Sequence, residues 1–216
     1  MSAAKLSYWD DRYQKDSGAF DWYQRYSGLK EIFAEHILKT DKILVAGCGQ
    51  ANMTRDMYSD GYRGGIWNVD HCRTVIERMK GRNDDLHGVH WEQDDIMELD
   101  YKDGTFDVCI NKAAFDAQLT GESSPVRAKK ICMEASRVLK PEGTFIVVSF
   151  HHGENMLRYL EDEAYGWEVT TEEKVLKPVL PDACIELDLN AIESYHYIYV
   201  CKKTGVPAIA EEGEEK

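Results

Sequence analysis

The chain has 216 residues, of which 43% are hydrophobic and 30% are charged, a composition typical of a soluble globular protein. No apolar run approaches the roughly 20 residues that span a bilayer. The polar, acidic N-terminus resembles neither a secretory signal nor a transit peptide, so we expect a cytoplasmic protein that contacts no membrane. The formal net charge is −13. Because an anionic surface repels phosphate backbones, this charge argues against a nucleic-acid partner and suits a basic protein partner.

Cysteine and histidine spacing indicates neither a disulfide framework nor a metal site. None of the six cysteines belongs to a CxxC pair, and several lie inside predicted strands or helices, where a thiol behaves as a small hydrophobic group. The seven histidines are scattered along the chain. We therefore expect reduced thiols and no bound metal. The cysteines are Cys48, Cys72, Cys109, Cys132, Cys184 and Cys201.

Strand-like and helix-like segments alternate along most of the chain. This alternation is the pattern of a doubly wound α/β fold with a parallel sheet. The predicted strands are Lys42–Ala46, Gly65–Val69, Val89–Gln93, Phe106–Ile110 and Thr144–Phe150. The predicted helices are Ala51–Ser59, His71–Lys80, a segment from Ser123 to about Leu139, and Glu154–Glu163.

Local signals mark several boundaries. Ser123 followed by Pro125 predicts a helix start, with a serine cap and a proline in the first turn. Pro141 to Gly143 predicts a turn before the fifth strand. Near the C-terminus, Trp167–Leu176 and Ser194–Lys203 are rich in β-forming residues and predict an antiparallel pair.

A glycine loop follows the first predicted strand. The segment Ile43 to Met53 runs from an apolar strand into Gly-Cys-Gly and then into a helix, whose N-terminal N–H groups favour an anion or a polar ligand edge. Gly47 permits the tight turn, and Gly49 lets the backbone approach a ligand. Asn52 stands where dinucleotide-binding loops carry a third glycine, and no Gly-Lys-Ser/Thr follows. The loop therefore argues against a nucleoside triphosphate and weakens the case for NAD.

Carboxylates follow the next two predicted strands. Asp70 ends the second strand, where a carboxylate can accept both hydroxyls of a ribose, although it could equally cap the following helix. Asp95 and Ile96 follow the third strand and could hold an adenine, unless Asp94 and Asp95 form a solvated turn. Because the glycine loop and both acids lie at the ends of successive strands, we favour an adenosine-binding site.

Longer motifs resemble those of a known family. The series GCG, VD and QDDI, followed by FDVCINKAAFDA and EASRVLKPEGTFIVVSF, resembles the seven-β-strand S-adenosylmethionine-dependent methyltransferases. The N-terminal stretch YWDDRYQKDSGAFDWYQRYSGL is similar to the opening of the elongation factor 1-alpha lysine methyltransferases, the group related to methyltransferase-like protein 13 and to the lysine methyltransferase 4 type. The resemblance covers Tyr8 to Lys203.

The resemblance implies a fold, a cofactor and an activity. The fold is an α/β, Rossmann-like seven-stranded methyltransferase fold, with a mostly parallel sheet, an antiparallel C-terminal strand and helices on both faces. The cofactor is S-adenosylmethionine, and the acceptor is a lysine side chain of a protein, with elongation factor 1-alpha as the expected substrate. Residues 1–205 would form one methyltransferase domain, and residues 206–216, which end in EEGEEK, an acidic disordered tail.

The resemblance also implies the residues that bind the cofactor. An aromatic lid segment at about residues 8–27 would close over the methionine end, and Lys112 would lie near the cofactor and the acceptor entrance. Aromatic faces attract a sulfonium cation, which supports the lid on physical grounds. The alternative is that these aromatics are core residues of an amphipathic helix. The implied lid contacts are Trp9, Tyr13 and Trp22, and the implied adenosine contacts are Gly47, Asp70, His71, Asp95 and Ile96.

The segment after the fourth strand departs from the family pattern. Related methyltransferases carry an acidic residue, lysine, glycine and threonine there, followed by Leu-Asp-Ala, whereas this chain has NKAAFDA from Asn111 to Ala117. The cofactor site should survive, but acceptor specificity stays open. Asp116 is a candidate for orienting the acceptor, although a helix cap is the favoured interpretation, and no catalytic residue is assigned. His151 and His152 could face the acceptor channel or the solvent.

The expected reaction is an in-line displacement in which a lysine amine attacks the sulfonium methyl. The amine has a solution pKa near 10.4 and must first lose a proton, which an apolar slot and the nearby sulfonium would favour. The fourth strand does not end in Asn/Asp-Pro-Pro-Tyr/Phe, which argues against methylation of amide or base nitrogens. Three alternatives stay open: a small-molecule methyltransferase, a cofactor-binding module without turnover, and an NAD-dependent oxidoreductase, for which 216 residues leave little room.

Overall fold

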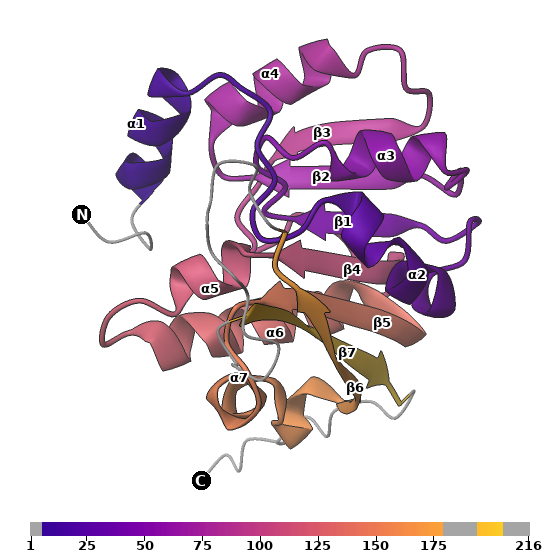
Figure 1. Cartoon of the computed structure of the whole chain (residues 1–216). Helices are drawn as coiled ribbons and strands as arrows, with labels where there is room; N and C mark the ends of the chain where they lie inside the picture. Colours follow the sequence, from indigo (N-terminus) through magenta and orange to yellow (C-terminus); the bar gives the residue numbers. More distant parts are fainter. Residues whose placement is uncertain (1–5, 179–193, 205–216) are drawn as a thin grey trace, which may run out of the picture.

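The computed structural model describes residues 6–178 and 194–204. Its centre is a seven-stranded sheet with the order β3-β2-β1-β4-β5-β7-β6 (Figure 1). Strands β1 to β5 pair in parallel, whereas β7 runs antiparallel to both β5 and β6, as predicted. The strands are β1 Ile43–Ala46, β2 Ile66–Asp70, β3 Val89–Gln93, β4 Phe106–Lys112, β5 Leu139–Ser149, β6 Trp167–Leu176 and β7 Tyr195–Lys203.

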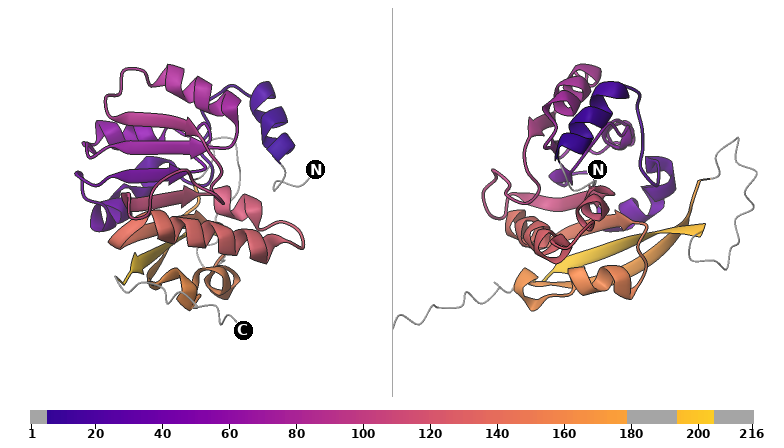
Figure 2. Two further views of the ribbon diagram at one scale, coloured as in Figure 1. Left: turned by 180° about the vertical axis from the view of Figure 1, so that it is seen from behind. Right: turned by 90° about the vertical axis from the view of Figure 1, so that its left-hand side faces the viewer.

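Helices cover both faces of the sheet, because successive strand residues point to opposite sides. In β1, Ile43 and Val45 belong to one buried apolar cluster, and Leu44 and Ala46 belong to the other. Helices α2, α3 and α4 pack on the first cluster, and α5, α6 and α7 on the second, so the sheet lies between two helical layers (Figure 2). The helices are α1 Leu6–Lys15, α2 Tyr26–His36, α3 Met53–Ser59, α4 Arg73–Arg82, α5 Ala114–Gln118, α6 Ser124–Val138 and α7 Glu154–Leu160.

The predicted turn at Pro141 to Gly143 is wrong. These residues lie within β5, where Glu142 adopts a left-handed φ of 63° and the pairing register with β4 shifts. The Pro-Glu-Gly sequence therefore forms an irregular segment within β5, similar to a β-bulge, and β5 pairs with β4 on both sides of it. Local turn chemistry could not reveal that continuation.

One predicted helix differs in its extent, and one predicted cap differs in its hydrogen bonding. The segment Glu154–Glu163 is not one helix: α7 ends at Leu160, and a separate 3-10 turn, η1 Glu163–Tyr165, follows it. The Asp162 side chain caps this turn by accepting a hydrogen bond from the Ala164 N–H at 2.9 Å. The N-cap residue of α6 is Ser123, as predicted, but its side chain makes no capping hydrogen bond.

Several expectations concern the cysteines and the ends of the chain. The five cysteines in the described part of the chain are buried and unpaired, as expected for reduced thiols, whereas Cys184 and the predicted tail at 206–216 lie outside the described residues. No helix within residues 6–178 and 194–204 is long and apolar enough to cross a bilayer.

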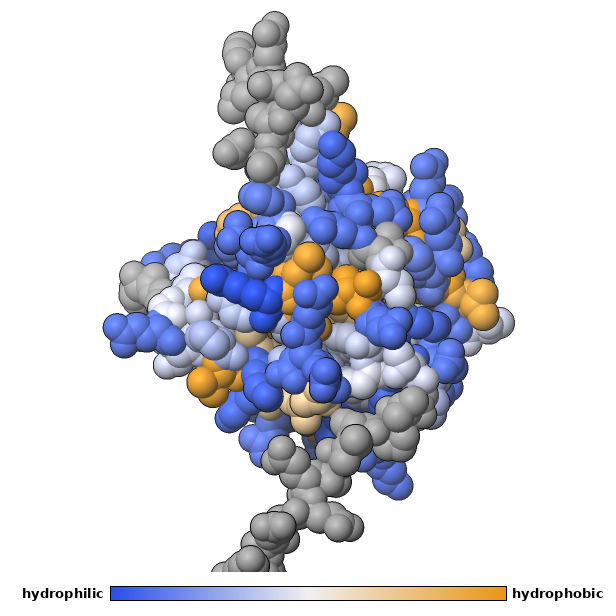
Figure 3. All heavy atoms as spheres, turned by 90° about the horizontal axis from the view of Figure 1, so that it is seen from below, coloured by the Kyte–Doolittle hydropathy of each residue, from blue (hydrophilic) through white to orange (hydrophobic). Residues whose placement is uncertain are grey.

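The face seen from the β6 side is mostly hydrophilic, with a few small apolar groups (Figure 3).

The topology brings the predicted ligand-binding residues together. The parallel strands β1 to β4 end at the same edge of the sheet, and α1 and α5 lie beside that edge (Figure 1). Loops that follow the carboxyl ends of parallel strands commonly form ligand sites in open α/β sheets.

Candidate functional site

A cavity of about 460 Å³ lies at the carboxyl ends of the parallel strands. Its size is typical of small-molecule and cofactor sites. Each residue that the sequence indicated as a cofactor contact lines this one cavity. These residues are Trp9, Tyr13, Trp22, Gly47, Asp70, His71, Asp95, Ile96 and Lys112.

The glycine loop closes tightly around the end of β1. Both Gly47 and Gly49 adopt left-handed backbone conformations, with φ of 76° and 54°. A Cβ atom on Gly47 would lie 2.3 Å from the Ala114 Cβ, and one on Gly49 would lie 3.0 Å from the Tyr13 hydroxyl. The loop therefore has room for glycine alone at the first position, and its backbone forms part of the cavity wall.

Asp70 fixes the loop and also faces the cavity. Its Oδ2 accepts a hydrogen bond from the Gly49 N–H, and its Oδ1 accepts one from the Cys72 N–H, both at 3.0 Å. The N-cap of α4 is Cys72, so Asp70 supports the helix start without being its cap. Burial raises the pKa of Asp70, and the two hydrogen bonds oppose that shift. Since a carboxylate offers about four acceptor sites, it can still accept hydroxyl donors.

His71 lies next to this carboxylate. Its Nδ1 is 3.6 Å from Asp70 Oδ1, and its Nε2 is buried with no hydrogen-bond partner among the described residues. A buried ring nitrogen without a partner is costly, so a polar group of a ligand would satisfy it.

Asp95 and Ile96 line the cavity beyond the end of β3. Asp95 Oδ1 accepts a hydrogen bond from the Met97 N–H at 2.9 Å, and Asp95 forms an isolated bridge with Glu98. Asp95 therefore belongs to a turn and lines the cavity at the same time. The two interpretations that the sequence left open for this residue do not exclude each other.

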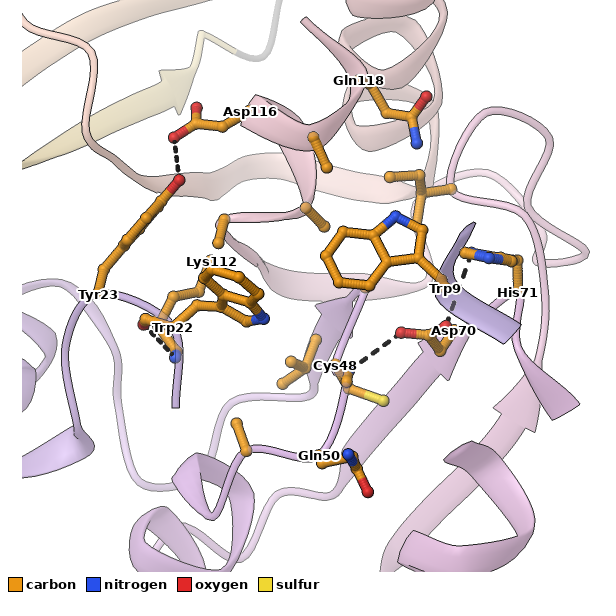
Figure 4. A pocket seen from close by; sticks show the side chains of 18 of the residues that line it. Trp9, Trp22, Tyr23, Cys48, Gln50, Asp70, His71, Lys112, Asp116 and Gln118 are labelled. Atoms are coloured by element: carbon orange, nitrogen blue, oxygen red, sulfur yellow. Dashed lines mark hydrogen bonds and ion pairs between the residues drawn. The ribbon is translucent and has the colours of Figure 1, made fainter. Parts of the chain in front are cut away.

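Three aromatic side chains of the N-terminal segment line the cavity together. On α1 the Trp9 and Tyr13 rings stack with their centroids 5.7 Å apart. The Trp22 ring meets the Trp9 ring edge-on, at a centroid distance of 6.0 Å, and both tryptophans are drawn in Figure 4. Tyr13 lines the cavity and also belongs to the apolar core. Both interpretations of this residue, as a lining residue of the site and as a core residue of a helix, therefore apply. Trp22 lies outside any helix, so that alternative is wrong for it.

Lys112 is bonded to the segment that the sequence predicts to be a lid. Its Nζ donates hydrogen bonds to the Trp22 carbonyl at 2.8 Å and to Asp21 Oδ1 at 3.3 Å. Burial lowers the pKa of Lys112, and the Asp21 carboxylate opposes that shift. Asp21 Oδ2 in turn accepts a hydrogen bond from the Asn52 N–H at 3.2 Å, which ties the same segment to the start of α3.

The structure adds cavity residues that the sequence left unassigned. Asp116 is the third residue of α5 and not its cap, so the favoured cap interpretation was wrong. The N-cap is Ala113, which adopts a left-handed φ of 70°, a backbone conformation that favours glycine. Tyr23 and Phe150 also line the cavity, as does His151, which the sequence placed toward either an acceptor channel or the solvent. Phe150 follows the carboxyl end of β5, so the strand-end rule that identified Asp70 could have found it.

The donor set fits S-adenosylmethionine better than a dinucleotide. Asp70, Asp95 and Asp116 all line the cavity, and among the described residues Lys112 is the one lysine or arginine that does so, already paired with Asp21. A pyrophosphate would meet these carboxylates without a free cation to balance its charge. A sulfonium cation would instead meet aromatic faces, to which cations are attracted by about 0.5–2 kcal/mol.

Comparisons with known proteins identify the family of the chain. Residues 37–199 match the family described as methyltransferase domain. The chain is 30% identical over 175 residues to EEF1A lysine methyltransferase 4 of Bos taurus, which covers 76% of this chain and 68% of that protein. It is 32% identical over 146 residues to the eEF1A lysine and N-terminal methyltransferase of Mus musculus, covering 66% of this chain and 21% of that longer protein.

Solved structures share the fold. A geranyl diphosphate methyltransferase in complex with SAM superposes with a TM-score of 0.60 at 17% identity, over 82% of this chain and 85% of that one. A SAM-dependent methyltransferase from Aquifex aeolicus superposes with a TM-score of 0.61 at 14% identity, over 89% and 97%. Because the family model spans more than half of the sequence, the chain belongs to the methyltransferase-domain family and is an enzyme that uses S-adenosylmethionine as methyl donor.

Proposed function

We propose that the enzyme methylates a lysine side chain of a protein and that elongation factor 1-alpha is this protein. The observation that carries the proposal is the 30% identity, over 76% of the chain, to a relative named EEF1A lysine methyltransferase 4. The net charge of −13 adds support, because an acidic enzyme attracts a basic partner and repels nucleic acid. We also propose that the enzyme acts in the cytoplasm and that residues 1–205 work as one methyltransferase domain.

We assign the adenosine end of the cofactor to the strand-end carboxylates. Asp70 would accept the two ribose hydroxyls with the acceptor sites that its backbone contacts leave open. Asp95 would accept the exocyclic amine of adenine while Ile96 covers a face of the ring. The unpartnered Nε2 of His71 would lie beside the adenine.

We assign the methionine end to the lid segment of residues 8–27 and to the glycine loop. Trp9, Tyr13 and Trp22 would present their rings to the sulfonium, and the backbone at Gly47 would support the chain that follows. Lys112 contributes by holding the lid closed, since its ammonium is already bonded to the segment that carries Trp22.

The cofactor supplies an electrophilic methyl group on a sulfonium. The residues of this chain bring the acceptor into line with that methyl and exclude water from the cavity. Orientation of this kind contributes up to roughly 7–11 kcal/mol of barrier lowering in well-aligned reactions, so the protein needs no covalent step of its own.

A transfer assay tests the proposal. The enzyme, tritiated S-adenosylmethionine and recombinant elongation factor 1-alpha are incubated, and acid hydrolysis of the labelled protein is expected to release methylated lysine. The Asp70→Ala variant should lose the label, whereas Asp84→Ala, which alters an exposed acid on the surface, should keep it. Label found in small molecules of a cell extract would favour a small-molecule methyltransferase. Cofactor binding without transfer to any component would favour a module without turnover.

A further inference from the structure

Asp116 lies at the end of the cavity away from the proposed adenosine site. Figure 4 shows Asp116 and Tyr23 on one side and Asp70 and His71 on the other, with Trp9 and Trp22 drawn between the two sets. Asp116 is 5% exposed, so its carboxylate is nearly withdrawn from water although it borders the cavity.

The hydrogen bonds of this carboxylate leave one acceptor direction open. Its Oδ1 accepts from the Ser149 hydroxyl at 2.7 Å, and its Oδ2 accepts from the Tyr23 hydroxyl at 2.8 Å and from the Phe150 N–H at 3.1 Å. A carboxylate offers about four acceptor sites, two on each oxygen, so one on Oδ1 stays available. All three donors are neutral groups.

No lysine or arginine in the described part of the chain forms an ion pair with this carboxylate. Lys112, the lysine of the same cavity, pairs with Asp21 instead. Burial raises the pKa of Asp116, and the hydrogen bonds from Ser149, Phe150 and Tyr23 oppose that shift. A buried anion of this kind is stabilised when a cationic ligand approaches it.

Aromatic side chains surround the approach to Asp116. The Tyr23 ring lies 6.0 Å from the Phe150 ring and 6.4 Å from the Trp22 ring, and all three side chains line the cavity. Phe150 is 49% exposed, which places an aromatic face at the surface. Aromatic faces attract ammonium groups, so this wall suits an unbranched chain that ends in one.

We propose that Asp116 is the acceptor-binding catalytic residue: its open Oδ1 site receives the ammonium of an unbranched primary amine, and Tyr23 fixes the carboxylate for that contact. The proposal rests on the proposed function, because it assigns the acceptor end of the same cavity. The acceptor's N–H bond breaks, its proton moves to Oδ1, and the electron pair stays on nitrogen. That pair forms the bond to the methyl carbon while the methyl–sulfur bond breaks toward sulfur, and Asp116 then releases its proton to water.

A binding experiment separates this role from a structural one. The enzyme is saturated with S-adenosylhomocysteine and titrated by NMR with n-butylammonium, which has the chain and charge of a lysine side-chain end, and with the neutral isostere n-butanol. The wild type should bind the ammonium at least tenfold more tightly. In Asp116→Asn that preference should disappear while affinity for S-adenosylhomocysteine changes less than twofold, and Asp103→Asn, an exposed acid, should behave as the wild type.

The possible outcomes are decisive. Equal binding of ammonium and alcohol by the wild type, or a preference that survives in Asp116→Asn, would overturn the proposal. Should Asp116→Asn fail to fold, Tyr23→Phe decides, because it keeps the carboxylate and removes the hydroxyl that fixes it. This variant should show a several-fold weaker preference for the ammonium over the alcohol, and a preference equal to that of the wild type would reject the proposed contact. An intact preference with no labelling of elongation factor 1-alpha would reject that substrate and leave the amine site standing.

Discussion

Replacing Lys112 by methionine should release the lid segment from the sheet. The ammonium of Lys112 donates to the Trp22 carbonyl at 2.8 Å and to Asp21 Oδ1 at 3.3 Å, and the side chains of the ion pair are only 5% and 9% exposed. Methionine retains the apolar stem and removes both hydrogen bonds. The Asp21 carboxylate would then be left with the Asn52 N–H as its remaining backbone donor.

The size of the effect follows from these contacts. Hydrogen bonds to charged groups contribute about 1.5–3 kcal/mol each. Burial of the ammonium costs free energy, as the lowered pKa of Lys112 indicates, and the methionine variant no longer incurs this cost. The net loss is therefore smaller than the sum of the two hydrogen bonds. We therefore expect a net loss of about 2 kcal/mol, which lowers the ratio of closed to open lid roughly 30-fold. The dissociation constant of S-adenosylhomocysteine should rise by up to the same factor, since the lid carries Trp9, Tyr13 and Trp22.

Calorimetry and limited proteolysis check this prediction together. Calorimetric titration gives the affinity, and trypsin reports lid opening through cleavage after Arg12, Lys15 or Arg25, all within the lid segment. Lys130→Met, an exposed lysine on α6, is the matched control and should change neither measurement. Unchanged affinity and unchanged cleavage in Lys112→Met would refute the idea that this lysine holds the lid.

Four further changes have defined outcomes. Asp70→Asn should raise the dissociation constant of S-adenosylhomocysteine at least tenfold with little loss of melting temperature, and an unchanged affinity would contradict the ribose assignment. Gly47→Ala should destabilise the fold by about 1–3 kcal/mol, whereas Gly81→Ala, on α4 with open space at its Cβ, should be neutral or stabilising; equal melting temperatures would argue against the tight loop. Ala113→Gly should relieve the left-handed backbone and stabilise by about 1 kcal/mol in urea unfolding, and a loss of stability would count against strain there. Burial lowers the pKa of His196 from 6.5 to about 4, so the neutral ring contributes fully to the free energy of unfolding above pH 6.5, and this contribution is lost as the pH falls toward 4. Between pH 7.5 and 5, the free energy of unfolding should fall by about 2 kcal/mol more in the wild type than in His196→Gln. Equal decreases in the two proteins would refute the lowered pKa.

The sequence determined the elements whose signals are local. The strand Val89–Gln93 was predicted with its observed bounds, and Trp167–Leu176 likewise, because apolar and β-branched runs flanked by breakers depend on neighbouring residues alone. The cavity lining at Gly47, Asp70 and Asp95 was predictable for a related reason, since parallel strands deliver their carboxyl ends to one edge of the sheet.

Tertiary structure decided what distant segments do to one another. Residues Pro141 to Gly143, which locally favour a turn, lie in an irregular part of β5 because the hydrogen bonds between β4 and β5 outweigh that local preference. Lys112 bonds to a carbonyl 90 residues earlier, and Asp116 bonds to a hydroxyl 93 residues earlier. No periodicity or spacing encodes such contacts. They arise only when the packed sheet places the N-terminal segment over its edge, where burial favours hydrogen-bond partners for polar groups such as Lys112 and Asp116.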